Sequence, residues 1–386
     1  MVSWLHPKRS LITFDLGAAG LRACQVQSRR SGSRRAAGVR VCDSLHVERR
    51  ASTETDKPTP PIVDPTQLDR LIGQGAFSGR NVALVLSPPE VQFLPLRLPA
   101  QALSQPRERV EQALRWEVAQ ASRKTGDELE VRFWPLPAAR GQQANVMAVS
   151  MPAETAARWS DEFARSRLAL RRIDVSPCAL VHLARRAWTP DERDLWGVLD
   201  LGHRHSILTV VVGTVPTYVR ELSISTHDWT RRLAEAFEVT PLVAEELKRQ
   251  HGVRPTARSV GPASRSRTPL AAGDLQDAVS SVLRDSLEAL AHETTRCLSY
   301  VFQSYPDVTL RRLFLAGGGA SVPGLQEGLT ANLGIDVTVL AANGSANGSA
   351  NGSSDGESWE HPLPDVRFGP QVAASLGGAM LGLEAP

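Results

Sequence analysis

Two stretches of the chain combine a carboxylate with glycine in a pattern that suits a metal-bound nucleotide. Asp15 ends an apolar run and is followed by Leu16 and Gly17, and Asp200 ends a second apolar run and is followed by Leu201 and Gly202. An aspartate at the end of a strand can hold a hydrated Mg²⁺ ion. Glycine and small residues let the N–H groups of a tight turn face phosphate oxygens. We therefore predict two phosphate-binding turns, with Asp15 and Asp200 as candidate metal ligands.

A third stretch near the end of the chain adds a triple glycine. Gly317, Gly318 and Gly319 follow an apolar run, and a helix is predicted to begin after Gly324. Glycine lets the backbone approach a ligand closely, and a helix start offers unpaired N–H groups. The order of strand, glycines and helix predicts a platform for a nucleotide. A tight turn without a ligand explains the same residues, so both interpretations stay open.

The elements around these turns follow from the periodicity of apolar residues. An apolar strand is predicted on each side of both aspartate turns. Between the two turns we expect a strand with an exposed edge at residues 91–99 and a helix at 105–121, with Val110, Leu114 and Val118 on one face. A long helix at 274–305 leads into the triple glycine, and a small-residue helix at 369–383 is expected to return to the first domain.

These predicted turns, strands and helices divide the chain into segments. The fold class is α/β, with two domains and an inserted α/β subdomain between the first turn and the second. The predicted segments are the first domain at 1–87, the inserted subdomain at 88–169, the return of the first domain at 170–195, the second domain at 196–340, a flexible Asn-Gly-Ser insertion at 341–360 and a C-terminal helix at 361–386.

Composition limits the function classes. A chain of 386 residues with 42% hydrophobic residues predicts a globular protein of two or more domains. Its net charge of +3 is too small to favour nucleic acid as a partner. Its four cysteines have no metal-ligand spacing and indicate reduced thiols. No apolar run has the length of a membrane span or a secretory signal, so we expect a cytoplasmic location.

The two turns and the triple glycine, in this order, resemble the actin-like ATPase superfamily. The resemblance implies an actin-like ATPase fold, in which two RNase H-like domains surround a nucleotide cleft, with ATP and Mg²⁺ as cofactors. The two hairpins would be the phosphate loops, and the triple glycine would lie against the adenosine.

The inserted region resembles the PilM family of type IV pilus assembly. The run from Ala113 through Arg115, Trp116 and Glu117 is similar to that family's Ile-Arg-Trp-Glu helix, and the segment from Ala316 to Gly324 matches its last motif. The resemblance implies a fold like that of the cell-division protein FtsA. It also implies a scaffold that is peripheral to the inner membrane, that binds the cytoplasmic tail of a PilN-like inner-membrane protein, and that works with other pilus-assembly components.

Carried onto this chain, the resemblance implies a set of cofactor-binding residues. They are Asp15, Gly17, Ala18, Ala19, Gly20, Arg22, Asp200, Gly202, Ser206, Glu245, Lys248, Gly317, Gly318 and Gly319. Arg22 stands where the family has a lysine, and it offers a planar fork in place of a point charge. His203, Arg204 and His205 occupy a turn that usually holds small residues. These departures predict weak or absent ATPase activity, because phosphoryl transfer depends on close positioning.

Other functions fit the same motifs. One is a related adaptor of type II secretion or cell division, and another is a sugar-kinase-like enzyme on the same fold. A kinase needs an aspartate base and polar sugar contacts in the cleft, and the sequence has no such cluster. Trp116 would anchor a bound peptide if it were exposed, but its helical spacing favours a buried side chain.

Overall fold

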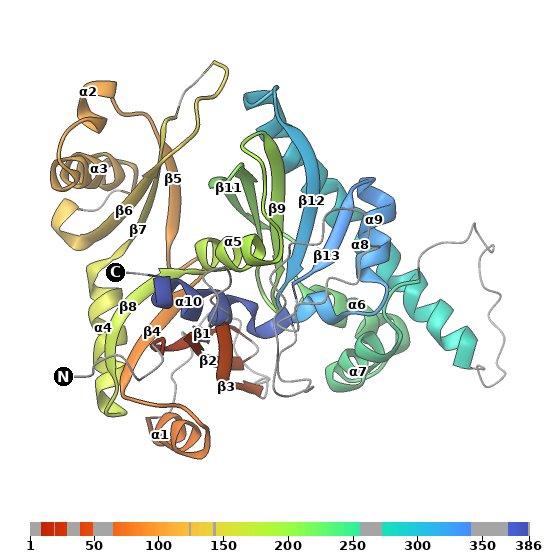
Figure 1. The fold of residues 1–386 in the computed structure, drawn as a ribbon. Helices are drawn as coiled ribbons and strands as arrows, with labels where there is room; N and C mark the ends of the chain where they lie inside the picture. Colours follow the sequence, from red (N-terminus) through yellow and green to blue (C-terminus); the bar gives the residue numbers. More distant parts are fainter. Residues whose placement is uncertain are drawn as a thin grey trace, which may run out of the picture.

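The molecule is built on two five-stranded sheets whose strands follow the same topological order (Figure 1). A computed structural model describes residues 9–18, 20–28, 39–48, 65–122, 125–141, 144–254, 272–340 and 370–384. The expected Asn-Gly-Ser insertion at 341–360 lies outside these described residues.

The first sheet has the order β3-β2-β1-β4-β8. Its strands are β1 (Ile12–Leu16), β2 (Gly20–Ser28), β3 (Val39–Glu48), β4 (Asn81–Leu86) and β8 (Ala169–Val175). β1, β2 and β3 form an antiparallel meander, whereas β4 runs parallel to both β1 and β8. The apolar run of β4 is buried along almost its whole length, as expected for a parallel strand covered on both faces.

The second sheet repeats this arrangement in the order β11-β10-β9-β12-β13. Its strands are β9 (Asp194–Leu201), β10 (Ser206–Val212), β11 (Val215–Leu222), β12 (Thr309–Ala316) and β13 (Asp336–Val339). β9, β10 and β11 are antiparallel, and β12 runs parallel to β9 and β13. The two sheets therefore share strand order and strand direction, with β1 corresponding to β9 and β4 corresponding to β12.

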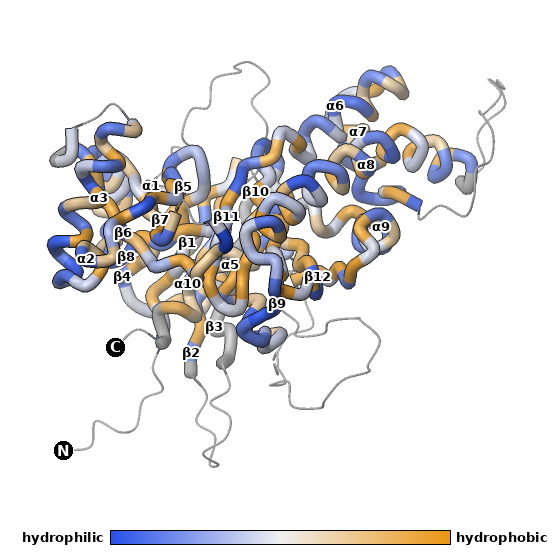
Figure 2. The backbone as a smooth tube through the Cα atoms, turned by 90° about the horizontal axis from the view of Figure 1, so that it is seen from above, coloured by the Kyte–Doolittle hydropathy of each residue, from blue (hydrophilic) through white to orange (hydrophobic). Residues whose placement is uncertain are grey.

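Two helices fill the space between the large sheets. α5 (Ser176–Ala187) and α10 (Ala373–Glu384) cross the centre of the molecule (Figure 1). They share one apolar core with strands of both sheets, including Val85 of the first and Phe314 of the second. The pair is tightly packed, because a Cβ atom added at Gly377 would overlap the carbonyl oxygen of Ala179. Figure 2 shows hydrophobic stretches along α10 and the strands beside it, as well as on helices farther out.

Other helices cover the outer faces of the sheets. α4 (Ala153–Arg165) packs on the first sheet through Trp159 and Phe163, and the Phe163 ring lies 5.3 Å from that of Phe14. The second sheet is covered by α6 (Thr226–Phe237), α7 (Pro241–His251), α8 (Ala272–Ser304) and α9 (Leu325–Leu333). α8 is the long helix expected from the sequence, and α1 (Pro65–Gln74) lies beside α4.

A small antiparallel sheet follows β4 in the chain, with the order β5-β7-β6. Its strands are β5 (Gln92–Leu96), β6 (Leu129–Pro135) and β7 (Val146–Pro152), and it is accompanied by α2 (Ala100–Leu103) and α3 (Arg107–Ser122). Val110, Leu114 and Val118 are buried on one face of α3, as the spacing predicted. The preference for a buried Trp116 was wrong: its relative exposure is 67%, because it points away from this apolar face.

The hairpin between β6 and β7 contacts the second large sheet. The Trp134 indole Nε1–H donates to the carbonyl oxygen of Pro216 at 2.8 Å, and the Arg140 backbone N–H donates to that of Ser304 at 2.8 Å. The Tyr305 hydroxyl donates to the carbonyl oxygen of Pro137 at 3.3 Å. The small sheet is thus joined to β11 and to the end of α8 as well as to the first large sheet.

The close approach of α10 to α5 gives a stability test. Gly377→Ala places a methyl group on the Ala179 carbonyl, so we expect the free energy of unfolding to fall by about 1–3 kcal/mol. Gly73→Ala in α1 is the matched control, since a Cβ there meets nothing within 4 Å. It should raise stability by roughly 0.5–1 kcal/mol. Urea unfolding followed by circular dichroism measures both, and equal stabilities for the two variants would contradict the packing argument.

Candidate functional site

The first candidate turn joins β1 to β2 and is closed by its two glycines. The Gly17 N–H donates to the Gly20 carbonyl at 3.0 Å, and the Gly20 N–H donates back to Gly17 at 3.3 Å. Asp15 is buried at the end of β1 and is the cross-strand partner of Arg22 on β2. The Arg22 Nη1 atom donates to Asp15 Oδ2 at 2.8 Å. Ala18 is exposed at the tip of the turn, whereas Ala19 lies outside the described residues.

The second candidate turn joins β9 to β10 and has the same register. Asp200 stands opposite Ile207, as Asp15 stands opposite Arg22. The Gly202 N–H donates to the His205 carbonyl at 3.1 Å. The start of α6 rests on this turn, since the backbone N–H groups of Thr226 and His227 donate to the carbonyls of Gly202 and His203. Ser206 is completely buried, and its Oγ atom has no hydrogen-bond partner.

The two turns face each other closely enough for their charges to interact. Burial raises the pKa of Asp200 to about 6; the Asp15 charge adds to this rise and the Arg22 charge opposes it. The pKa of Asp200 in the second turn therefore depends on the charges of both Asp15 and Arg22 in the first turn.

The triple glycine lies directly against the second turn. A Cβ atom at Gly317 would overlap Asp200 Oδ1, and Gly317 has a φ of +81°, which favours glycine. A Cβ atom at Gly319 would lie 2.7 Å from the Cβ of Leu201. Gly318 differs, because a Cβ there meets nothing within 4 Å. Gly317 and Gly319 thus have structural reasons to be glycine, whereas Gly318 borders open space.

Lys248 and Glu245 form a polar network between α6 and α7. The Lys248 Nζ atom donates to the Thr226 carbonyl at 3.0 Å, to the Thr230 hydroxyl at 2.8 Å and to Glu245 Oε2 at 2.7 Å. Lys248 is 2% exposed, so its three N–H groups all point into the protein. Burial would raise the pKa of Glu245, but Lys248 outweighs it and the pKa is lowered. The partly exposed Glu245 is the member of this pair with free surface.

His203 packs beside the same network. Its ring centroid lies 5.0 Å from that of His227. Burial, together with the charges of His227 and Lys248, lowers the pKa of His203 to about 4. His203 is therefore neutral at physiological pH. His205 instead pairs with Glu221, with 2.5 Å between Nδ1 and Oε1.

The donor set can be tested against a divalent cation. The carboxylates of Asp15 and Asp200 are hard oxygen ligands of the kind that Mg²⁺ prefers. One oxygen of Asp15 already accepts a hydrogen bond from Arg22, so a metal ion would share this carboxylate with a guanidinium. Within the described ranges, no three His, Cys, Asp or Glu side chains gather in a way that would hold a metal ion by themselves. The residues suit a cation that also binds a phosphate.

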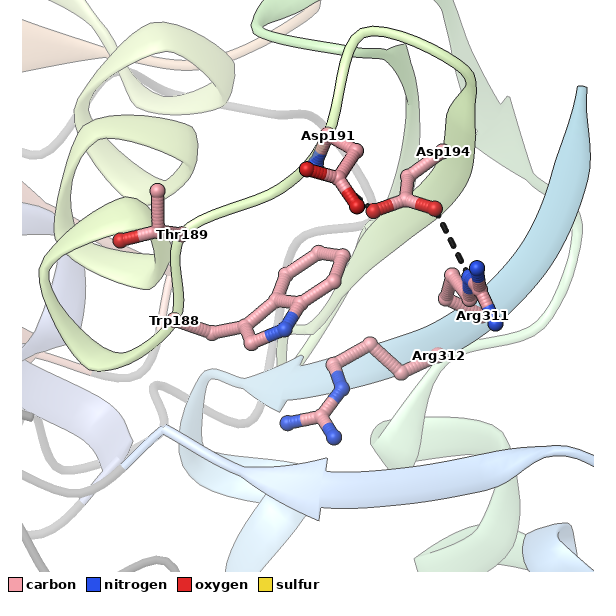
Figure 3. Close-up of a pocket in the computed structure, with 6 residues that line it drawn as sticks. All are labelled: Trp188, Thr189, Asp191, Asp194, Arg311 and Arg312. Atoms are coloured by element: carbon pink, nitrogen blue, oxygen red, sulfur yellow. Dashed lines mark hydrogen bonds and ion pairs between the residues drawn. The ribbon is translucent and has the colours of Figure 1, made fainter. Parts of the chain in front are cut away.

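A hollow lies at the end of the second sheet that is opposite to the Asp200 turn (Figure 3). It has a volume of about 280 Å³ and is lined by Trp188, Thr189, Asp191, Asp194, Arg311 and Arg312. Asp194 begins β9, about 20 Å of strand away from Asp200. The Arg311 side chain pairs with Asp194 at 2.7 Å, and Arg312 pairs with Asp336 at 2.9 Å. The residues that line this hollow form no recognisable sequence motif, so the sequence did not predict a site here.

Known proteins were compared with the chain. No family model matches it, and no curated protein sequence matches it. Among solved structures, a chain of the PilM-PilN type IV pilus biogenesis complex is 23% identical with a TM-score of 0.71, over 97% of this chain and 99% of that one. The ethanolamine utilization protein EutJ from Carboxydothermus hydrogenoformans is 14% identical with a TM-score of 0.51, over 98% of this chain and 91% of that one.

These similarities establish the fold. The chain has an actin-like ATPase fold. The expected resemblance to PilM is confirmed at the level of the fold, over nearly the full length of both chains. In the part of the chain that the structure describes, no helix is both long enough and apolar enough to cross a membrane.

The buried network at Lys248 gives a second stability test. Lys248→Met removes the cation that pairs with Glu245 and leaves this carboxylate and the Thr226 carbonyl with the hydrogen bonds of the Thr230 hydroxyl. We expect a loss of about 3 kcal/mol in the free energy of unfolding. Arg231→Met is the control, because the 60% exposed Arg231 side chain makes surface ion pairs worth less than about 1 kcal/mol. Chemical denaturation measures both variants. A loss at Lys248 no larger than that at Arg231 would show that the network is not a stability element.

Proposed function

We propose that this chain is an ATP-binding scaffold of the PilM family that works in type IV pilus assembly. In this role it lies at the cytoplasmic face of the inner membrane and binds the cytoplasmic tail of a PilN-like protein. The observation that carries the proposal is the similarity of fold to a chain of a PilM-PilN complex over 97% of one chain and 99% of the other. A likeness that includes the small inserted sheet favours a scaffold over an enzyme that shares the two-domain core alone.

The nucleotide part of the proposal rests on the two opposed turns. The glycine turns would receive the phosphates, and open space at Gly318 would receive the adenosine. Asp15 and Asp200 would hold Mg²⁺, which would supply neutralisation of the phosphate charge. Glu245, through its exposed side, is the member of the α7 pair that could reach a ribose. Gly17, Gly20, Gly202, Ser206 and Lys248 would then act mainly by shaping and supporting the turns.

The peptide part of the proposal rests on the small sheet. β5 pairs with β7 along one side, and no strand in the described part of the chain pairs with its other side. An extended segment can add to such an edge through backbone hydrogen bonds. α3 ends next to the start of β5, since the Ser122 hydroxyl donates to Gln92 Oε1 at 3.4 Å. Exposed Trp116 offers an aromatic ring on this helix.

Nucleotide binding is tested at the position with free space. Gly318→Leu puts a side chain where the adenosine is proposed to lie, so we expect ATP affinity to fall at least about tenfold. Because a Cβ at Gly318 touches nothing within 4 Å, the melting temperature without ATP should not change. Isothermal titration with ATP and Mg²⁺ measures the affinity. Absence of heat and of a thermal shift with the parent protein at saturating nucleotide would overturn the nucleotide proposal.

Peptide capture is tested with synthetic cytoplasmic tails of the single-span membrane proteins encoded near this gene. We expect one tail to bind, and Trp116→Ala to weaken it by about tenfold or more, as truncation of an aromatic anchor does. Phe302→Ala on α8 is the control, because this exposed ring lies on a different element and should not affect binding. Fluorescence anisotropy with labelled tails gives both affinities. If no tail binds with or without ATP, and a small acceptor is phosphorylated instead, a kinase replaces the scaffold.

A further inference from the structure

The hollow at the starts of β9 and β12 belongs to neither the proposed nucleotide site nor the proposed peptide surface. Its volume of about 280 Å³ is close to the lower limit of about 300 Å³ for small-ligand pockets. Trp188, Thr189 and Asp191 line it from the linker between α5 and β9, and Arg311 and Arg312 line it from β12. It has room for a small molecule or for one residue of a peptide.

Both arginines line the hollow because β12 is irregular at this point. Leu195 and Trp196 are neighbours on β9, whereas their partners on β12 are two residues apart. Arg311 is the extra residue between those partners, and Arg312 follows it. Neighbouring residues of a regular strand point to opposite faces of the sheet, but an extra residue of this kind is a β-bulge and re-aims a side chain. The bulge thus brings two guanidinium groups to one hollow.

Arg311 is fixed through its Nε atom and open at its outer end. Its Nε atom donates to Asp194 Oδ1 at 2.7 Å, and Asp194 Oδ2 accepts from the Asp191 backbone N–H at 2.7 Å. The Asp194 side chain is 6% exposed, whereas that of Arg311 is 53% exposed. Among the described residues, neither Nη atom of Arg311 has a hydrogen-bond partner. These two atoms form an open fork that matches the two oxygens of a carboxylate.

Arg312 and Trp188 form another side of the hollow. The Arg312 Nη2 atom pairs with Asp336 at 2.9 Å, and its Cζ atom lies 5.0 Å from the centroid of the Trp188 ring. That ring also packs edge-on against Trp196, with 5.7 Å between the centroids. Figure 3 shows the Trp188 ring and both arginines around the same hollow. The half-buried ring therefore offers apolar area at a fixed position beside the two cations.

The charges of the lining favour a ligand with one negative charge next to an apolar group. The Arg311 fork suits a carboxylate, and the Trp188 ring suits an apolar group. Each arginine already has a carboxylate partner, and the exposed Asp191 also lines the hollow. A second negative charge on the ligand would therefore be repelled, which disfavours a phosphate dianion. A cation is disfavoured as well, because the two guanidinium groups repel it.

We propose that this hollow binds an organic carboxylate that has an apolar group next to it. The carboxylate lies on the Nη atoms of Arg311, and the apolar group lies against the Trp188 ring. Two sources have this chemistry: a free aromatic or aliphatic acid, and the last residue of a peptide chain with a free carboxyl end. The hollow lies at the opposite end of the second sheet from Asp200, so the site does not depend on the nucleotide proposal.

Isothermal titration of the full chain with N-acetylphenylalanine tests the site. We expect a dissociation constant of about 1 mM or tighter. N-acetylphenylalaninamide lacks the charge, acetate lacks the ring and inorganic phosphate has too much charge, so each should bind at least about fivefold more weakly. A tetrapeptide that ends in phenylalanine separates the two sources. Binding tighter than that of N-acetylphenylalanine, and lost on amidation of the carboxyl end, assigns a chain end; weaker binding assigns a free acid.

Two variants of opposite charge test the sign of the ligand. Arg311→Gln keeps a donor for Asp194 but removes the charge and the fork, so the affinity for N-acetylphenylalanine should fall about tenfold. Asp191→Asn removes a repelling charge and should tighten binding about twofold. Arg193→Gln is the matched control, because the exposed Arg193 lies in the same linker but does not line the hollow. It should bind the acid as the parent does.

The outcomes divide clearly. Unchanged affinity in Arg311→Gln, or weaker binding in Asp191→Asn, overturns the proposal, and so does a parent protein that gives no heat with the acid or the peptide. Phosphate that binds more tightly than the acid overturns it too. If circular dichroism shows that Arg311→Gln does not fold, Arg312→Gln removes the other guanidinium and should weaken binding about fivefold; unchanged affinity there has the same meaning. ATP binding is measured separately, so its loss or presence leaves this test intact.

Discussion

Everything else in this molecule depends on the contact between α5 and α10. These helices separate the two large sheets, and each sheet buries apolar side chains against them. Gly377 brings the backbone of α10 onto the carbonyl of Ala179, which leaves no freedom for the helices to separate without loss of packing. Asp15 and Asp200 come from different sheets. The Asp15 charge acts on the pKa of Asp200 across the space between the sheets, and this layer of helices separates those sheets.

The repeated topology explains why the site has two similar halves, and the side chains explain why the halves are unequal. The register that puts Asp15 opposite Arg22 puts Asp200 opposite Ile207. The first turn therefore carries its own counter-ion. The second is supported by the start of α6 and by the buried Lys248 network. The same backbone thus holds one turn with a paired charge of its own and one turn supported by the buried Lys248 of α7.

Much of the fold could be predicted from local sequence patterns. The aspartate turns, the apolar strands beside them and the helices with apolar spacing are determined by short-range preferences, and the structure has them near the expected positions. The order of these motifs also favoured the actin-like fold, which the similarity to solved structures confirms. The individual cofactor contacts stay predictions, because they depend on a bound ligand. The domain boundaries stay predictions as well.

The remaining features depend on contacts between segments that are distant in the sequence. The spacing of apolar residues along the chain does not reveal such contacts. Helical spacing favoured a buried Trp116, but α3 packs through Val110, Leu114 and Val118 and leaves this ring exposed. The hollow beside Trp188 has no motif, since it forms where the starts of β9 and β12 meet. The inward direction of Lys248 depends on α6, which lies next to α7 only after folding.

These distant contacts also bear on how a scaffold could relate its two ligands. The small sheet is continuous in the chain with β4 and β8, yet the hairpin after β6 contacts β11 and the end of α8 through Trp134 and Arg140. The small sheet that carries the proposed peptide surface therefore contacts both halves that surround the proposed nucleotide site. A change in the angle between those halves cannot leave all of these contacts intact, because a hydrogen bond is lost when its donor and acceptor move apart. Coupling between the two ligands needs no separate signalling element, since the small sheet bridges the domains that the nucleotide would bring together.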